Sequence, residues 1–304
     1  MTGPGIPRRI FLRILLAAGG GLLAGRAGGR PAFSFLQTRT DEEIALAMMG
    51  RAGARGEGDF ASLVVSLALA FRGTPYGAGT LETAGEERLV VNLRALDCVT
   101  FVESTLALGL CVRQGDGTFE GFRRRLEHIR YRGGVRAGYA SRLHYFTDWI
   151  ADNQRKGILR DVTRILGGEP ENRPVGFMTA HRNAYPPLAE EPVLEQMRRV
   201  EAALTASTRW RIRKARVGRI ADKMRNGDIV ALTTDREGLD VSHTGWAVRE
   251  GGEIRLLHAS PVCGSVCMTE ESLAAHVARS RQCTGIVVAR VAEHGAGGRA
   301  PSQP

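Results

Sequence analysis

The sequence of 304 residues is long enough for one large domain or two of average size, and one domain is our default expectation. With 43% hydrophobic and 24% charged residues, its composition matches that of soluble globular proteins, which excludes a mostly disordered chain. The formal net charge is +10, but five of the arginines lie in residues 1–30, so the rest of the chain lacks the concentrated basic surface of a nucleic-acid-binding protein.

The first predicted element is an export signal in residues 1–30. The run PRRIFLR at residues 7–13 resembles the twin-arginine consensus, and a moderately apolar, glycine-containing stretch follows at residues 14–25. That stretch is too short to predict a membrane span, so we expect a periplasmic or secreted protein that contacts the membrane and the twin-arginine translocase only transiently. Two alternatives stay open: a cytoplasmic protein with a disordered basic tail, and a retained membrane anchor.

The remaining chain divides into a linker, one domain and a tail. Residues 31–58 are predicted to form a linker with a short helix, because an acidic run begins at Asp41 and a glycine-rich break follows it. We expect the domain over residues 59–292. A flexible, glycine-rich tail then covers residues 293–304.

Two helices are predicted near the start of the domain. Apolar residues recur at three- and four-residue steps over residues 59–71, which is typical of an amphipathic helix. A strand-like run follows at residues 88–93. Asp97 is a good N-cap for a second helix that begins at Cys98 and continues to about Val112. Its apolar residues cover nearly every side of the cylinder, so this helix should be buried on most faces.

After these helices, the pattern changes along the domain from helical to strand periodicity. Helices are expected at residues 119–131 and 193–204, an aromatic-rich segment at 143–150, a loop at 167–174, and an edge strand or helix start at 210–217. Strands are expected at residues 228–233, 242–248, 254–260 and 285–291. Helices followed by an antiparallel sheet indicate an α+β fold.

A cysteine and two histidines form the candidate catalytic group. Unpaired backbone N–H groups and the helix dipole favour an anion at the first turn of a helix, so we expect a lowered pKa for the Cys98 thiol. If Gly251 and Gly252 form a hairpin turn, His258 lies opposite Gly245 and His243 is its diagonal neighbour. One imidazole would then act as the base and the other would orient it. The same spacing also allows structural histidines and an inert buried cysteine.

Six short runs of the sequence resemble one family of cell-wall enzymes. They are similar to the NlpC superfamily of papain-like peptidases, and more narrowly to its N-acetylmuramoyl-L-alanine amidase-like branch. The likeness extends from about Asp59 to Arg290, with the runs in the same order throughout. The runs are TPYG (74–77), LDCVTF (96–101), RYRG (130–133), SRLHYFTDW (141–149), HTG (243–245) and LHAS (257–260).

The resemblance implies a papain-like fold in which a buried N-terminal helix carrying the cysteine packs on an antiparallel sheet carrying the histidines. It implies that Cys98 is the nucleophile, His243 the general base and His258 the third polar residue. Tyr76 matches a tyrosine that lines the site, where its hydroxyl assists the oxyanion beside the backbone N–H of Cys98. Asp97 matches a residue that holds a substrate amino group in the broader superfamily, although capping its own helix is an equally good account.

The branch also implies a substrate and a reaction. The expected reaction is hydrolysis of the amide between muramic or anhydromuramic acid and L-alanine in peptidoglycan fragments, with no metal and no cofactor. Arg142 and His144 are further candidates for substrate binding, because Arg binds carboxylates through two hydrogen bonds. Two alternatives stay open: an endopeptidase acting on the bond between D-glutamate and a diamino acid, and a wall-binding module without catalysis.

Five cysteines are an odd number for an exported protein, so at least one thiol is unpaired within the chain. Cys98 is the expected free thiol. A disulfide among Cys263, Cys267 and Cys283 fits an oxidising compartment. A zinc site that uses these cysteines and His276 would have unusual spacing.

Overall fold

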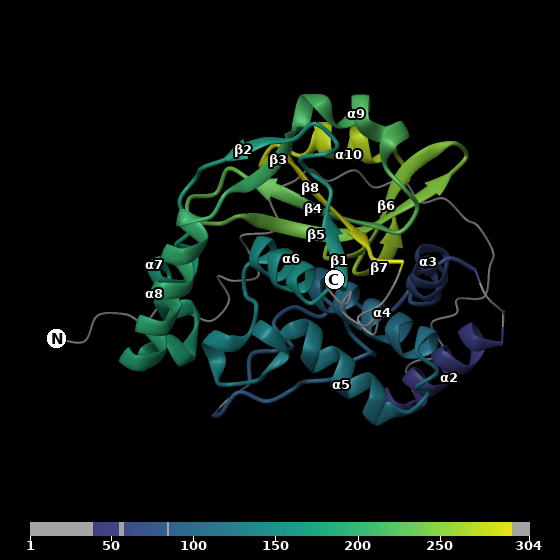
Figure 1. The fold of residues 1–304 in the computed structure, drawn as a ribbon, viewed down its shortest axis with the longest axis horizontal. Coiled ribbons are helices and arrows are strands. Elements are labelled where there is room, and N and C mark those ends of the chain that lie inside the picture. The colour runs from purple at the N-terminus through teal and green to yellow at the C-terminus, as the bar shows by residue number, and fades with distance from the viewer. Residues whose placement is uncertain (1–38, 55–57, 84, 294–304) are drawn as a thin grey trace, which may run out of the picture.

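The computed structural model describes residues 39–54, 58–83 and 85–293 (Figure 1). The predicted export signal lies outside the described residues, as does all but the first residue of the predicted tail. In the described part of the chain, no helix combines the length and apolar character that crossing a membrane would require.

One antiparallel sheet organises the molecule, which confirms the predicted α+β arrangement. The strand order is β2-β3-β8-β4-β5-β6-β7, and β1 also pairs with β8. The strands are β1 (Leu159–Asp161), β2 (Glu169–Glu171), β3 (Arg209–Arg213), β4 (Asp228–Thr234), β5 (Val241–Glu250), β6 (Glu253–Ser260), β7 (Ser265–Met268) and β8 (Cys283–Val291). Each paired set of strands runs antiparallel.

Helices cover both faces of the sheet and one end of it (Figure 1). One face carries α2 (Asp41–Gly53), α3 (Phe60–Ala70), α4 (Cys98–Arg113), α5 (Phe119–Arg130) and α6 (Phe146–Arg155). The other carries α9 (Val217–Ile220) and α10 (Leu273–Arg279), and α7 (Phe177–Ala180) and α8 (Glu191–Ala206) lie at the end. Short 3-10 turns are η2 (Arg132–Gly134), η3 (Tyr139–Ser141), η4 (Arg182–Ala184), η5 (Pro186–Ala189), η6 (Lys214–Arg216) and η7 (Ala221–Lys223).

Two hydrophobic cores lie on the two sides of the sheet. In β4, Ile229 and Ala231 pack into the core shared with α2–α6, whereas Val230 and Leu232 pack into the core shared with α9 and α10. This alternation is the two-residue period of a strand that is buried on both faces. β4 is hydrogen-bonded to its neighbour β5, which carries one of the candidate histidines.

Helix α4 is the central helix, and its burial matches the expectation. Residues Thr100 to Cys111 are all buried, although they include the charged Glu103. The Glu103 carboxylate accepts a hydrogen bond from Arg130 Nε at 2.8 Å, and these two side chains are only 2% and 3% exposed. A buried charge needs such a partner, so the pair fixes α5 against α4.

The prediction of a strand at residues 88–93 is wrong, because the structure has no regular strand there. Side chains satisfy the backbone groups of this segment in place of a neighbouring strand. Arg130 donates to the Val90 carbonyl at 2.6 Å, and Leu93 N–H donates to Asp41 at 2.8 Å. A segment whose polar backbone groups are paired in this way gains little from joining a sheet.

Several short elements depart from the expectations in smaller ways. β2 lies inside the predicted loop at residues 167–174, and β7 and α10 were not predicted. The segment at residues 210–217 is not at an edge, since β3 pairs with both β2 and β8.

Candidate active site

The tip of α4 is set by a capping arrangement at Asp97. The Asp97 carboxylate accepts the Thr100 N–H at 2.8 Å, and the Thr100 hydroxyl accepts the Asp97 N–H at 2.9 Å. These reciprocal bonds satisfy two backbone donors at the start of the helix. They make Cys98 the first helical residue and leave the Asp97 carboxylate engaged by its own helix.

The sulfur of Cys98 meets strand β5 where the sheet opens. Regular pairing of β5 with β6 begins at Glu250–Glu253 and ends at Trp246–Leu257. Just beyond that end, the backbone of Thr244 lies close enough to the Cys98 sulfur to lower the thiol pKa, as do backbone groups of Cys98 and Val99. The thiol therefore lies against the residue that follows His243.

The two histidines form a direct pair, as the hairpin register predicted. A Cβ placed on Gly245 would lie 2.9 Å from the Cβ of His258, so these residues are opposite each other. His243 Nε2 lies 2.6 Å from His258 Nδ1, and the two rings are nearly perpendicular with centroids 4.8 Å apart. This bond leaves the other ring nitrogen of His243 available. Among the described residues, no hydrogen bond joins either imidazole to the Cys98 sulfur.

A third histidine, which the sequence did not assign to the site, extends this pair. The His276 ring of α10 lies 5.7 Å from the His258 ring at an interplanar angle of 83°. His276 Nδ1 lies 3.2 Å from Glu271 Oε1, and Arg279 contacts the same carboxylate oxygen at 2.6 Å. No signal in the sequence pointed to this contact, because α10 itself was not predicted.

Tyr76 lies beside the thiol because its backbone joins two parts of the site. The Tyr76 N–H donates to Gly264 O at 2.9 Å, and the Gly77 N–H donates to Leu96 O at 3.1 Å. Burial is the main cause that raises the pKa of the Tyr76 phenol, followed by the charges of Cys98 and Asp97. The phenol is therefore a neutral hydrogen-bond donor near the sulfur.

A disulfide joins Cys263 and Cys267 next to these residues. Cys267 is the partner of His258 in the register of β6 and β7, and the enclosed Gly264 accepts the Tyr76 N–H. The disulfide thus closes the turn that holds both side chains. Cys98, Cys111 and Cys283 are free.

The disulfide selects between two open interpretations of the cysteines. Because Cys263 and Cys267 are bonded to each other, neither has a free thiolate to bind zinc. In the described ranges, no group of three or more His, Cys, Asp or Glu side chains is arranged to hold a metal ion.

Burial dominates the protonation of the site. It raises the pKa of the Cys98 thiol to about 12, with Asp97 adding to the effect, and the backbone hydrogen bonds oppose it without prevailing. The expected lowering of this pKa is therefore wrong, because desolvation outweighs the helix terminus. Burial, followed by the charge of His276, lowers the pKa of His243 to about 4. Burial and then His243 lower that of His258 to about 2. The resting site is thus a neutral thiol beside neutral imidazoles.

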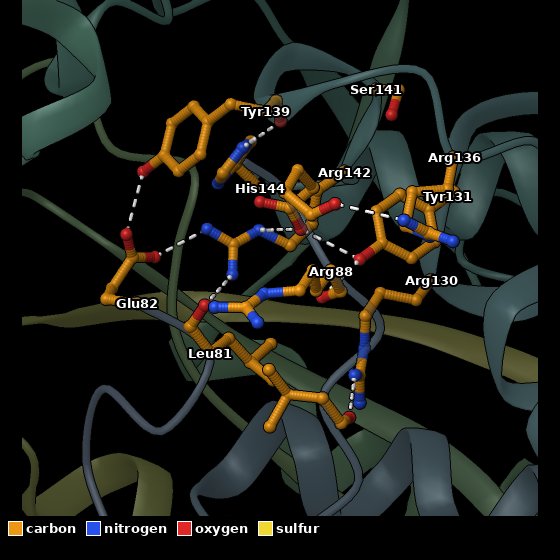
Figure 2. A network of polar contacts seen from close by, with 12 residues as sticks. Leu81, Glu82, Arg88, Arg130, Tyr131, Arg136, Tyr139, Ser141, Arg142 and His144 are labelled. Carbon is orange, nitrogen blue, oxygen red and sulfur yellow. Dashed lines mark hydrogen bonds and ion pairs between the residues drawn. The ribbon is translucent and has the colours of Figure 1, made fainter. Parts of the chain in front are cut away.

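Arg142 and His144 belong to a network around residues 81–88 (Figure 2). Arg142 is 4% exposed, and it donates to Leu81 O at 3.0 Å and to Glu82 Oε1 at 2.6 Å. His144 Nε2 donates to Tyr139 O at 2.9 Å. Burial and then Arg142 lower the pKa of His144 to about 3, so it is neutral. These contacts hold the loop in place. Direct substrate binding by Arg142 or His144 stays a prediction.

Comparison with known proteins adds a family and several solved structures. The family model described as AmiA-like, N-acetylmuramoyl-L-alanine amidase-like, matches residues 66–286. An N-acetylmuramoyl-L-alanine amidase from Bacteroides uniformis is 34% identical, with 77% of this chain and 100% of that chain covered and a TM-score of 0.73. A Bacteroides fragilis protein provisionally named a xylanase is 40% identical over 74% of this chain and 99% of its own, with a TM-score of 0.69.

A further structural match is more distant. A Legionella pneumophila protein is 21% identical over 83% of this chain and 95% of its own, with a TM-score of 0.60, and so shares the fold. No curated protein matches the sequence.

Proposed function

The chain belongs to the AmiA-like, N-acetylmuramoyl-L-alanine amidase-like family, and we propose that it is a cysteine-dependent amidase of peptidoglycan fragments. The bond cut is the amide between the lactyl group of muramic or anhydromuramic acid and L-alanine. One observation carries this proposal: the α4 tip places a thiol against the residue that follows a hydrogen-bonded histidine. The Bacteroides uniformis neighbour, which carries the same activity in its name, supports the choice of bond.

In the first step, His243 removes the thiol proton while the Cys98 sulfur attacks the carbonyl carbon of the lactyl amide. The His243 nitrogen that takes this proton is Nδ1, because Nε2 is bonded to His258. The new oxyanion accepts hydrogen bonds from the Cys98 backbone N–H and the Tyr76 hydroxyl. Because the thiol and imidazole both rest neutral, proton transfer accompanies attack and no preformed ion pair is needed.

Two further steps complete the turnover. The His243 imidazolium donates its proton to the alanine nitrogen, the C–N bond breaks, and the lactyl acyl group stays on sulfur as a thioester. Water then loses a proton to His243 and attacks the thioester. The products are the lactyl carboxylate and the restored Cys98 thiol.

His258 and His276 position the base in this scheme. When Nδ1 of His243 accepts the thiol proton, its Nε2 must carry a proton and donate it to His258 Nδ1. His258 then holds its own proton on Nε2. The His276 ring, fixed by Glu271, packs against the His258 ring and restricts its rotation. Both residues therefore act through His243, and neither contacts the substrate.

The same arrangement supports membership of the NlpC, papain-like superfamily. A buried helix starts with the nucleophile and packs on an antiparallel sheet that carries the base and its partner, which is the architecture that the superfamily implies. The family match at residues 66–286 falls within the proposed domain of residues 59–292. Twin-arginine export to the periplasm or beyond remains part of the proposal, since it would bring the protein to its substrate.

Glycoside hydrolysis, the activity in the name of the Bacteroides fragilis neighbour, fits the site poorly. A retaining glycosidase needs two carboxyl groups about 5–5.5 Å apart across the scissile bond. The carboxylate next to Cys98 is Asp97, and it is engaged in capping α4. A thiol and two imidazoles serve acyl transfer instead.

Product analysis distinguishes the amidase from its rivals. Defined anhydromuropeptides are digested with the full chain and the products are identified by mass spectrometry. The amidase releases a peptide with a free N-terminal L-alanine and leaves the sugar without a peptide. Release of a diamino acid N-terminus would establish the endopeptidase instead, and retention of intact muropeptide without cleavage would establish a binding module.

A further inference from the structure

A groove of about 660 Å³ is lined by residues of the segments 147–165 and 204–210 and by Val287. Its walls come from α6, from β1 and the segment after it, from the C-terminal end of α8 and from strand β3 (Figure 1). None of the candidate catalytic residues lines it. Its volume lies within the range of small-molecule binding sites, about 300–1,000 Å³.

The groove carries an excess of positive charge. Its lining includes Arg160, Arg164 and Arg209 against one carboxylate, Asp161. Burial raises the pKa of Asp161. Other arginines of the described chain form close ion pairs, such as Arg142 with Glu82 at 2.6 Å. By contrast, no ion pair is formed by the three groove arginines in the described residues.

Arg209 is the buried member of the three. It is 8% exposed, and one terminal nitrogen donates to the Arg173 carbonyl, but its Nε has no hydrogen-bond partner. Asp240 acts on its charge from nearby, yet the Asp240 carboxylate already accepts bonds from Thr147 and Val241. A buried guanidinium with an unmet donor is costly, and the negative charge of a carboxylate in the groove would lower that cost.

The groove also has an apolar component. The Arg164 guanidinium lies over the Trp210 ring at 4.9 Å from its centroid, and Ile165 is 65% exposed at the rim. The buried side chains of Ile150 and Leu204 lie beneath them. A polyphosphate or nucleic-acid backbone would leave this apolar surface without a partner. A short peptide that alternates small apolar side chains with free carboxylates matches both components.

We propose that this groove is a second binding site, separate from the catalytic centre, for a peptide that carries free carboxylates. Wall peptides of alanine, D-glutamate and a diamino acid have this chemistry, and their choice as the natural ligand rests on the proposed function. Carboxylates pair with the exposed Arg160 and Arg164 near the buried charge of Arg209, and alanine methyl groups contact Trp210 and Ile165. Such a site would hold the enzyme on a wall fragment whose other peptide is being cut.

The test uses the full chain with Cys98→Ala, so that the ligand is not consumed. The probe is synthetic L-Ala-γ-D-Glu-diaminopimelate, and the readout is the Trp210 indole N–H resonance, assigned with Trp210→Phe. Trp149 and Trp246 are fully buried, so their resonances are internal references. We expect the Trp210 resonance to shift in a saturable way. Arg160→Ala/Arg164→Ala should weaken this binding about tenfold or more.

Matched controls isolate the charge and the ligand class. Arg219→Ala/Arg281→Ala removes the same charge from exposed positions outside the groove and should leave the affinity unchanged. A peptide with all carboxylates amidated should not shift Trp210. Equal binding of that peptide, tighter binding of inorganic phosphate, or no Trp210 shift at all would overturn the proposal. These results do not depend on turnover, so failure of the amidase proposal is measured separately with unmodified Cys98.

Discussion

Nε2 of His243 lies 2.6 Å from Nδ1 of His258, across the point where β5 and β6 separate. This hydrogen bond fixes which His243 nitrogen remains for the thiol. It also makes β6 a part of the catalytic machinery, although β6 supplies neither the nucleophile nor the base.

The first prediction concerns the two histidines of this pair. His243→Ala removes the base and should lower kcat by about 10²–10⁴-fold, since this is the usual contribution of general acid–base catalysis. His258→Ala should lower kcat by a smaller factor, because the base remains and only its orientation is lost. His258→Gln keeps a hydrogen-bonding group and should retain more activity than His258→Ala. Equal activity of the two His258 variants would contradict an orienting role.

The second prediction concerns the acid limb of the pH profile. The His243 pKa is lowered to about 4, so the base stays neutral well below the ordinary imidazole value of 6.5. The kcat/KM of the wild-type protein should therefore fall as the pH drops through about 4. The free energy of unfolding also declines below pH 6.5, because these histidines bind protons in the unfolded state that they do not bind in the folded state. Activity must therefore be normalised to the folded fraction. An acid limb of the kcat/KM profile near pH 6.5 would contradict a base whose pKa is lowered by burial.

His276 offers a variant that moves this limb in a known direction. Burial lowers the pKa of His276 itself, and its protonated form contributes to lowering the pKa values of His243 and His258. His276→Gln removes that charge, so the acid limb should shift to higher pH, and kcat should fall with little change in KM. His181→Gln on α7 is the matched control. A His276→Gln profile that superimposes on the wild-type profile would show that His276 only packs.

The third prediction concerns the disulfide. The Cys263–Cys267 bond closes the turn whose Gly264 holds Tyr76 and whose Cys267 pairs with His258. Cys263→Ser/Cys267→Ser should lower the free energy of unfolding by about 2 kcal/mol, from the loss of a short loop closure. It should also lower kcat, as measured on a muropeptide. A reductant should have the same effects on the wild type and none on the variant, and a reductant effect on both would point to Cys98 instead.

The fourth prediction concerns the buried ion pair under the active-site helix. Glu103→Gln leaves Arg130 charged and without its carboxylate at 3% side-chain exposure, which should lower the free energy of unfolding by about 3–5 kcal/mol. Denaturation in urea measures this loss. Glu103→Gln/Arg130→Met removes both charges and should restore part of the stability. A single variant as stable as the wild type would show that the pair does not hold α5 on α4.

The sequence predicted those parts of the site that local rules determine. Asp97 is a recognisable N-cap, so the start of α4 at Cys98 followed from it. Gly251 and Gly252 fixed the hairpin turn, and the register then placed His258 opposite Gly245. Both inferences need only contacts between residues that are close in the chain or paired across one turn.

Properties that depend on distant packing could not be predicted in the same way. The thiol pKa depends on how much water the surrounding elements exclude, and this desolvation outweighed the effect of the helix terminus. The strand expected at residues 88–93 failed because Arg130 and Asp41, both remote in sequence, satisfy its backbone. His276 reaches His258 only through the placement of α10 on the sheet.

The most direct test of Cys98 as the nucleophile is the turnover of an anhydromuropeptide by Cys98→Ala. It is followed by mass spectrometry and compared with the wild type at equal folded concentration. For Cys98→Ala we expect an unchanged thermal unfolding midpoint and no detectable release of the L-alanine-terminated peptide. We also expect the wild type, quenched in acid during turnover, to carry the muramyl acyl mass on the peptide that contains Cys98. Undiminished release of the L-alanine-terminated peptide by Cys98→Ala would contradict catalysis by the Cys98 thiol.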